Sequence, residues 1–199
     1  MMRPWRDWLI GGLFFALAGC ASDTNSAGTG EATMLIGPQL PIRAISPAEF
    51  AFKGQVTQVL TMRFGEQSIN LEAQLVMSKS EVRAILLDSL GRRAVTLAWR
   101  EGKLESQLAS WLPPGIRADA IFADMMILYG QPAALQAALK DSGCALELGR
   151  ASRLLRCRDK EVLRAEYELK SPKTLNGSLH YANLAWGYDV DVQSAEVLR

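Results

Sequence analysis

The sequence predicts a mainly β fold: an open antiparallel half-barrel of about nine to eleven strands, with inserted helices covering its concave face. Two observations carry this prediction. Apolar and polar residues alternate over most of residues 56–108 and 144–192, as they do in half-buried antiparallel strands. Between these stretches, residues 117–140 change to a helical pattern. Because one face of the curved sheet is apolar, we expect the helices to cover it.

The chain begins with the features of an export signal. Arg3 and Arg6 precede a short apolar run that ends in Leu17-Ala18-Gly19-Cys20. The run is shorter than the ~20 residues that a membrane-spanning helix needs. Its last four residues resemble the lipobox of bacterial lipoproteins. We therefore expect residues 1–19 to be removed and acyl chains on Cys20 to anchor the mature protein in a membrane. An ordinary signal peptide that ends in Cys by chance is the alternative.

The segment after the anchor is expected to be a flexible tether, covering residues 20–47. Residues 21–33 are mostly Ala, Ser, Thr, Gly and Asn, and Pro38, Pro41 and Pro47 follow. The ordered domain then covers residues 48–199. Removal of the signal lowers the basic residues from 22 to 20 and the acidic residues from 21 to 20. A mature net charge near zero gives no broad attraction to nucleic acid, so we expect no nucleic-acid partner.

The strands of the first half form a meander. Its expected strands cover residues 56–64, 69–77, 82–87, 95–99 and 104–108, joined by short turns such as Glu101-Gly102. Pro113-Pro114-Gly115 then ends the sheet pattern. The helix expected over 117–129 is apolar almost all round, which predicts burial on most sides. Gly130 fits the position after a helix end, and Pro132 fits the first turn of a second helix over 132–140.

Asp124 interrupts the apolar pattern of the first expected helix. We expect its side chain to reach solvent or a backbone partner. After the helices, Cys144 and Cys157 flank a tight turn around Gly149 and Ser152. If Gly149 faces Ser152, the same register places the two cysteines opposite each other, close to disulfide geometry. Two free thiols or a slipped register are the alternatives. The remaining expected strands cover residues 162–169, 179–181 and 188–192.

Motifs for catalysis and metal binding were not found in the sequence. The one histidine, His180, lies on a strand between Leu179 and Tyr181 and faces the side opposite to them. It has no partner at a spacing typical of metal ligands. Nucleophile-elbow, phosphate-loop and zincin motifs are not present either. We therefore expect no metal, no cofactor and no enzymatic activity, and a binding function is the default.

One stretch of the sequence reads Leu86-Leu87-Asp88-Ser89-Leu90-Gly91-Arg92-Arg93-Ala94-Val95-Thr96-Leu97. This stretch resembles part of LolB, the outer-membrane receptor for lipoproteins. The resemblance implies that Leu90, before Gly91, is a protruding tip that inserts into the membrane. Arg92 and Arg93 would then contact lipid phosphate groups. It also implies a LolB/LolA-like fold and a LolA-like periplasmic carrier as a partner.

The second half is more similar to a LolB-like lipoprotein family, some members of which are encoded beside aryl-polyene synthesis genes. The similar pieces are residues 123–132, 153–155 and 188–192, and the whole resemblance covers roughly residues 50–195. The paired cysteines and the two arginines after the tip depart from LolB. These departures leave a more specialised lipid cargo open.

The function expected from these features is a lipid-binding carrier or receptor, a monomer on the periplasmic face of the outer membrane. Ala21 stands where Asp would retain a lipoprotein in the inner membrane, by resemblance to that sorting rule. A non-enzymatic scaffold of an envelope biosynthesis system is the alternative, and an enzyme acting on a lipid or glycan is a third. The residues expected to line an acyl cavity are Met62, Phe64, Leu71, Leu75, Leu97, Trp99, Met125 and Met126.

Overall fold

The computed structural model describes residues 32–169 and 174–197, which form twelve strands, two α-helices and a short 3₁₀ turn over Pro47–Glu49. The strands of the first half are β1 Thr33–Gly37, β2 Leu40–Arg43, β3 Gly54–Phe64, β4 Gln67–Met77, β5 Glu81–Asp88, β6 Arg93–Arg100 and β7 Lys103–Leu108. The two helices are α1 Ala118–Tyr129 and α2 Pro132–Leu139. The strands of the second half are β8 Cys144–Leu148, β9 Ser152–Cys157, β10 Lys160–Leu169, β11 Gly177–Asn183 and β12 Tyr188–Glu196.

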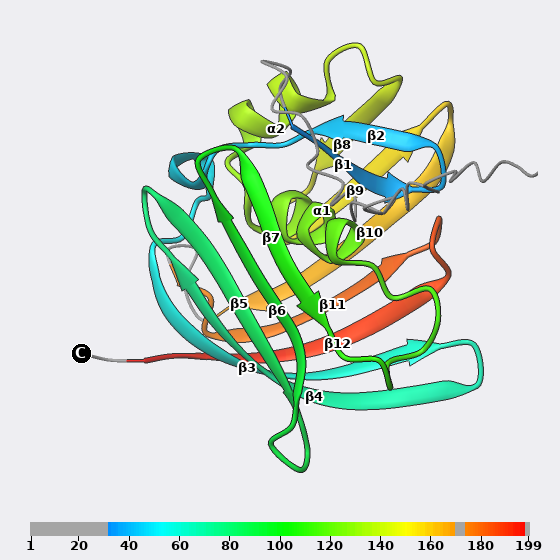
Figure 1. Cartoon of the computed structure of the whole chain (residues 1–199). Coiled ribbons are helices and arrows are strands. Elements are labelled where there is room, and N and C mark those ends of the chain that lie inside the picture. Colours follow the sequence, from blue (N-terminus) through cyan, green and yellow to red (C-terminus); the bar gives the residue numbers. More distant parts are fainter. Residues whose placement is uncertain (1–31, 170–173, 198–199) are drawn as a thin grey trace, which may run out of the picture. The chain divides into compact units, whose positions relative to one another are not determined.

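Ten strands form one curved antiparallel sheet in the order β7-β6-β5-β4-β3-β12-β11-β10-β9-β8. Two meanders, β3 to β7 and β8 to β12, are joined through the pairing of β3 with β12. The edge strands β7 and β8 do not pair with each other, so the sheet is not closed. Figure 1 shows the sheet curving around α1. The predicted mainly β fold with an open antiparallel sheet and two helices is therefore confirmed.

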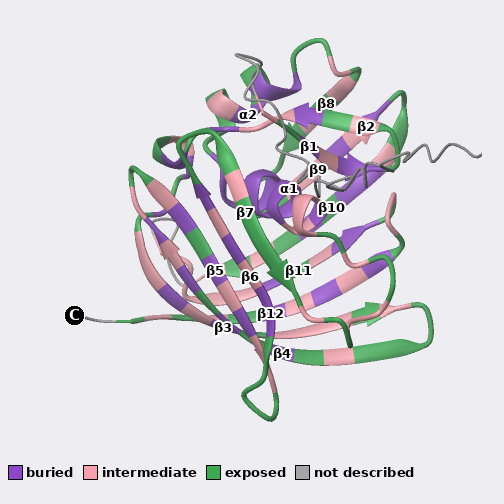
Figure 2. Cartoon of the chain, in the orientation of Figure 1, coloured by how far each residue is buried: buried purple, intermediate pink, exposed green. Residues whose placement is uncertain are grey.

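The alternating pattern along β4 shows why these segments form half-buried strands. Leu71, Ala73 and Leu75 are buried, whereas the intervening Glu72 and Gln74 are exposed. Side chains at every second position of a strand share one face, so burial of that face selects the register. In Figure 2 buried segments alternate with exposed ones along the strands. The inner face of the sheet is thus the apolar face.

Helix α1 is buried on nearly all sides, as its composition predicted. Nine of its twelve residues are buried, and Phe122 packs against Trp99 with ring centroids 5.2 Å apart. The helix ends at Gly130, but this glycine does not adopt the left-handed conformation typical of a helix end, since its φ is −71°. A Cβ at Gly130 would lie 2.6 Å from the Met126 carbonyl oxygen and 2.8 Å from Ile45. The glycine is therefore required by close packing.

The predicted boundaries of the tether were wrong. Strands β1 and β2 form an antiparallel hairpin inside the segment 20–47, and β1 packs against α1. Met34, Ile36 and Ile42 of this hairpin are buried in the core. The prolines suggested irregular structure, but Pro41 lies in a two-stranded hairpin, where a strand tolerates the loss of a ladder donor. Ordered structure thus begins by residue 32 instead of 48.

The predicted disulfide is confirmed. Cys144 of β8 and Cys157 of β9 are register partners and form a disulfide. The Gly149 amide donates to the Ser152 carbonyl oxygen at 3.0 Å, which is the turn contact from which the register was predicted. The bond ties the edge strand β8 to the rest of the sheet.

We predict that replacing both cysteines with alanine destabilises the domain by about 3 kcal/mol, because the unfolded chain gains the freedom of a short closed loop. The 13-residue separation of the two cysteines is in the range for this estimate. Urea unfolding of the oxidised protein and of the C144A/C157A variant measures the difference. Equal midpoints and slopes for the two proteins would show that the edge strand does not depend on the bond.

Candidate functional site

An apolar cavity lies between the inner face of the sheet and α1. It has a volume of about 70 Å³. Its wall draws on β3, β4, β5, β6, β11, β12, α1 and the segment between β7 and α1. The lining residues are Gln58, Leu60, Met62, Leu71, Ala73, Leu75, Ala84, Leu86, Val95, Leu112, Ile116, Ile121, Met125, Leu128, Tyr129, Tyr181, Val190 and Val192.

The register of the strands places the apolar side chains of the sheet next to one another in the cavity wall. Leu60 pairs with Leu71 on one side and with Val192 on the other, so three apolar side chains form a row across three strands. Met62 and Val190 form the next row on the same face. Since inward-facing positions recur at every second residue, each such row adds to one continuous apolar surface.

The helix side of the wall comes from one stripe of α1. Ile121, Met125 and Leu128 recur at helical spacing and line the cavity together. Leu112 and Ile116, from the segment before α1, complete the wall and are only half-buried. The cavity is therefore covered on one side by an irregular segment and not by a strand or helix.

Four of the eight predicted lining residues line the cavity, namely Met62, Leu71, Leu75 and Met125. The other four predicted residues, Phe64, Leu97, Trp99 and Met126, do not. Leu97, Trp99 and Met126 are fully packed in the core, and the Trp99 indole donates to the Ile45 carbonyl oxygen at 2.9 Å. Phe64 packs beside Tyr188, with ring centroids 6.5 Å apart.

Three polar lining residues were not predicted: Gln58, Tyr129 and Tyr181. The Gln58 amide nitrogen donates to the Tyr129 hydroxyl at 3.1 Å and to the Ser194 hydroxyl at 2.8 Å. A signal was available for Gln58, because it lies between Val56 and Leu60 at period two and so faces inward. A polar residue in an apolar row is informative, since its burial costs free energy unless it is hydrogen-bonded.

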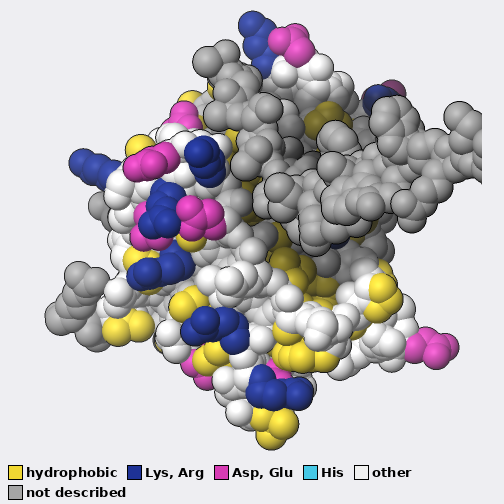
Figure 3. Space-filling model, viewed as in Figure 1, with side chains coloured by type: hydrophobic (Ala, Val, Ile, Leu, Met, Phe, Trp, Pro, Cys, Tyr) yellow, Lys and Arg dark blue, Asp and Glu magenta, His cyan; other side chains and the backbone are white. Residues whose placement is uncertain are grey.

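The β5–β6 turn carries the residues predicted to form a membrane tip. Leu90 is 78% exposed, the highest value among the large hydrophobic residues described. Gly91 adopts a φ of +74°, which glycine allows without strain. Figure 3 shows hydrophobic side chains at this lower end of the protein, next to basic ones. The structure therefore projects Leu90 outward and does not pack it against its own sheet.

The turn is held by Asp88, whose carboxylate accepts from the backbone amides of Leu90 and Arg92 at 3.0 and 2.8 Å. The Arg92 guanidinium donates to the same carboxylate at 2.7 Å and lies 4.9 Å from the Trp111 ring centroid. Burial acts to raise the pKa of Asp88, but these hydrogen bonds outweigh it and the pKa is lowered. Arg92 is thus engaged within the turn, whereas Arg93 is exposed and makes no ion pair with a described residue.

Asp124 occupies a different place from the one predicted. It is buried in the core, where its carboxylate accepts from the Tyr188 hydroxyl and, at 2.8 Å, from the Asn183 amide. The Asn183 amide also donates to the Ile36 carbonyl oxygen at 3.1 Å. Burial raises the pKa of Asp124 to about 7, although the two hydrogen bonds act to lower it. This cluster joins α1 to β1, β11 and β12, and it does not line the apolar cavity.

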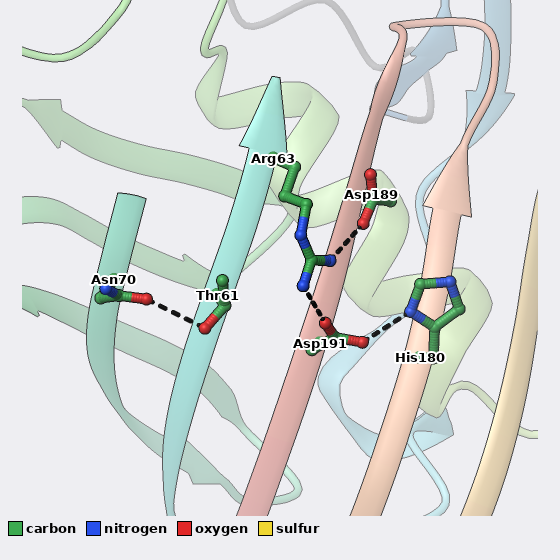
Figure 4. Close-up of polar contacts among 6 residues, drawn as sticks. All are labelled: Thr61, Arg63, Asn70, His180, Asp189 and Asp191. Atoms are coloured by element: carbon green, nitrogen blue, oxygen red, sulfur yellow. Dashed lines mark hydrogen bonds and ion pairs between the residues drawn. The ribbon is translucent and has the colours of Figure 1, made fainter. Parts of the chain in front are cut away.

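The outer face of the sheet carries an exposed polar network (Figure 4). Arg63 of β3 donates to Asp189 at 2.7 Å and to Asp191 at 2.6 Å, both on β12. Asp191 is also 2.7 Å from the His180 ring, which confirms that His180 faces away from Tyr181. The hydrogen bonds from Arg63 and His180 lower the pKa of Asp191. Ion pairs as exposed as these contribute little stability.

A wider groove of about 740 Å³ lies on the other side of Leu128 and Tyr129. Its wall is mixed, with Arg150, Arg153, Ser152 and Glu168 among apolar residues. Arg153 is used structurally, because its guanidinium donates to the Ile127 and Gly130 carbonyl oxygens at the end of α1. The smaller cavity is the better candidate site, since its lining is almost wholly apolar and free of ion pairs.

Other predictions concern residues that the structure does not describe. Cys20, Ala21 and the signal 1–19 lie outside the described residues. Within residues 32–169 and 174–197, no helix is both long and apolar enough to span a membrane. In the same part of the chain, no group of three His, Cys, Asp or Glu side chains is placed to hold a metal ion.

Comparisons with known proteins give a family match. Residues 55–196 match the family described as "Protein of unknown function (DUF3261)", which is most of the chain. Among curated proteins, none matches. Among solved structures, the chain is similar to a DUF1329 family protein from Desulfovibrio piger ATCC 29098, with 9% sequence identity and a TM-score of 0.35. The similarity covers 71% of this chain and 82% of that chain.

Proposed function

This chain belongs to the DUF3261 family, and we propose that it binds acyl chains or lipidated cargo beneath α1 and helps to pass them to a membrane. The observation that carries the proposal is the apolar cavity, which has no charged side chain in its wall. Each methylene that moves from water into such a wall contributes about 0.8 kcal/mol. Met62 and Met125 suit flexible chains, because methionine adapts its shape easily. The role proposed is non-enzymatic.

Binding of a whole acyl chain requires the cavity to widen. Its 70 Å³ exceeds the ~10–15 Å³ that one water needs, but it does not hold a long hydrocarbon chain. The segment 109–117 is the part that can yield. The Ala109 amide donates to Ala94, whereas the backbone bonds from Leu112 to Ala109 and from Ile116 to Pro113 stay within the segment. Displacing Leu112 and Ile116 therefore breaks no ladder bond of the sheet.

The proposed delivery step uses the β5–β6 turn and a lipid anchor. Leu90 would enter the bilayer, and Arg93 would contact lipid phosphates. Acyl chains on Cys20 would hold the protein at the periplasmic face of the outer membrane, and a LolA-like carrier would supply the cargo. The packing of Arg92 on Trp111 links the turn to the segment that covers the cavity.

Native mass spectrometry of the chain from residue 21 onward tests the proposal. The sheet and the core lie within residues 32–197, so we expect this part to fold without the signal. This chain, exported behind a cleavable signal peptide and purified from the bacterial periplasm, should carry adducts with the masses of acyl species. After solvent extraction, these species should be found in the lipid fraction. Protein that stays free of adducts, even after incubation with a palmitoyl lysophospholipid, would contradict acyl binding.

Replacing Leu90 with Glu should slow transfer of bound acyl cargo to anionic vesicles roughly tenfold or more, because burial of a leucine side chain contributes about 1.5–3 kcal/mol. Transfer of a fluorescent acyl lipid measures the rate. Ser89→Glu is the matched control, since it adds the same charge to the neighbouring exposed position. Equal transfer rates for the Leu90 variant and the unchanged protein would show that Leu90 has no role in transfer.

The free edge of β7 favours a second candidate function, a partner-binding scaffold. Among the described strands it pairs with β6 alone, and five of its six residues are exposed. An exposed edge offers backbone groups to an extended segment of another protein. A protein that binds no acyl species but retains a defined partner in affinity purification would favour the scaffold.

A further inference from the structure

We infer that Gln58, Tyr129 and Tyr181 form a polar subsite inside the apolar cavity, which selects cargo with an uncharged oxygen group on its hydrocarbon chain. Hydroxyl, ester and amide groups fit this description. A plain hydrocarbon or a carboxylate does not. The inference rests on the proposed function and narrows the class of ligand that the same cavity takes.

The three residues reach the cavity from separate elements. Tyr181 of β11 pairs with Val190 of β12, which pairs with Met62 of β3, so these three share the inner face. Gln58 lies four residues before Met62 on β3 and therefore on that face too. Tyr129 is the last residue of α1 and is held by its bond with Gln58. Sheet and helix thus both contribute polar groups to one apolar wall.

The subsite has hydrogen-bonding capacity that the described residues leave unused. Of the four tyrosines, Tyr181 is the one whose hydroxyl makes no hydrogen bond with a described residue. The Gln58 amide nitrogen has two partners, whereas its oxygen accepts from no described donor. The Tyr129 hydroxyl accepts from Gln58 and has no described acceptor for its own proton. Two donors and one acceptor are therefore available to a ligand.

These atoms are also accessible. In the described part of the chain, Thr96 carries the one fully enclosed side-chain oxygen without a partner. The oxygens of Gln58 and Tyr181 are therefore in contact with open space and not sealed in protein. A buried polar group without a partner costs free energy, so a ligand that supplies the partner binds more tightly.

The chemistry of the wall favours an uncharged group. None of the lining residues is Lys, Arg, His, Asp or Glu, so a charged ligand group would find no counter-charge. Burial raises the pKa of Tyr129 to about 12 and that of Tyr181 well above its ordinary value. Both hydroxyls therefore stay protonated near neutral pH and act as donors. A hydroxyl or carbonyl oxygen accepts from them without bringing a charge into the cavity.

The test compares decane, 1-decanol and decanoate at pH 8 as competitors of the uncharged apolar dye N-phenyl-1-naphthylamine, with the chain from residue 21 onward. We expect 1-decanol to compete about three- to tenfold better than decane, the range for one or two net hydrogen bonds, and decanoate to compete worst. Tyr181→Phe should lose this preference for 1-decanol and retain its affinity for decane. Tyr167→Phe is the matched control, because the Tyr167 hydroxyl donates to the Leu128 carbonyl oxygen and Tyr167 does not line this cavity.

The outcomes distinguish a failure of the proposed acyl binding from a failure of the polar subsite. If neither the dye nor any competitor binds, the proposed acyl-binding function fails, and the subsite fails with it. If decane and 1-decanol compete equally, the apolar cavity stands and the subsite alone is overturned. The subsite is also overturned if decanoate competes best, or if Tyr181→Phe retains the preference for 1-decanol.

Discussion

Replacing Ala73 with Leu should weaken acyl binding by at least about tenfold while the protein stays folded. Ala73 is a small lining residue on β4, opposite Gln58 in the register. Three additional carbon atoms would occupy space that the ligand needs, and each displaced methylene removes about 0.8 kcal/mol of binding free energy. Competition with the apolar dye gives the affinity, and near-ultraviolet circular dichroism reports whether the fold is retained.

Gln74→Leu is the matched control for the Ala73 variant. It places the same side chain on the same strand, but on the outer face, where Gln74 is exposed. We expect this control to bind acyl ligands as the unchanged protein does. A loss of binding of equal size in both variants would indicate general damage to β4. An Ala73 variant that binds normally would place the acyl chain elsewhere.

Replacing Asp124 with Asn should remove a pH-dependent loss of stability of about 4 kcal/mol. The pKa of Asp124 is raised from 3.8 to about 7 in the folded protein, chiefly by burial. Between these two values the unfolded chain loses the proton and the folded protein retains it. The contribution of Asp124 to the free energy of unfolding is therefore fully present below about pH 4. It decreases by about 1.36 kcal/mol per pH unit as the pH rises to about 7.

Urea unfolding between pH 4 and pH 8 measures this effect. Asn at position 124 can still accept from Asn183 and donate to Tyr188, so the cluster retains its hydrogen bonds. The difference in unfolding free energy between the variant and the unchanged protein should therefore grow in favour of the variant as the pH rises. Asp119→Asn, on the surface of the same helix beside Arg117, is the control. Parallel curves for the Asp124 variant and the unchanged protein would contradict the raised pKa.

The strands and the disulfide could be predicted because local signals determine them. The alternation in β4 defines a face without reference to the rest of the chain. The turn between Gly149 and Ser152 sets the register for Cys144 and Cys157 five residues away on each side. The β1–β2 hairpin was missed because it is short, contains Pro41 and buries its apolar side chains against distant parts of the chain such as α1. Contacts of this kind are not visible in a local pattern.

The site could be predicted only in part for a related reason. Alternation identifies Leu75 and Leu97 alike as inward-facing, yet only Leu75 borders the cavity. The difference depends on how far α1 reaches across the sheet, which follows from tertiary packing such as that of Phe122 on Trp99. The polar character of the subsite was missed because the inward-facing tyrosines were not distinguished from ordinary core residues.

The central claim, that an acyl chain lies between the sheet and α1, is tested most directly by NMR of methionine methyl groups labelled with ¹³C. Met62 and Met125 line the cavity, whereas Met34 and Met126 are buried in the core outside it. A palmitoyl lysophospholipid, added below its critical micelle concentration, should shift the signals of Met62 and Met125 and leave those of Met34 and Met126 nearly unchanged. Signals of Met62 and Met125 that stay in place at saturating ligand would contradict the account.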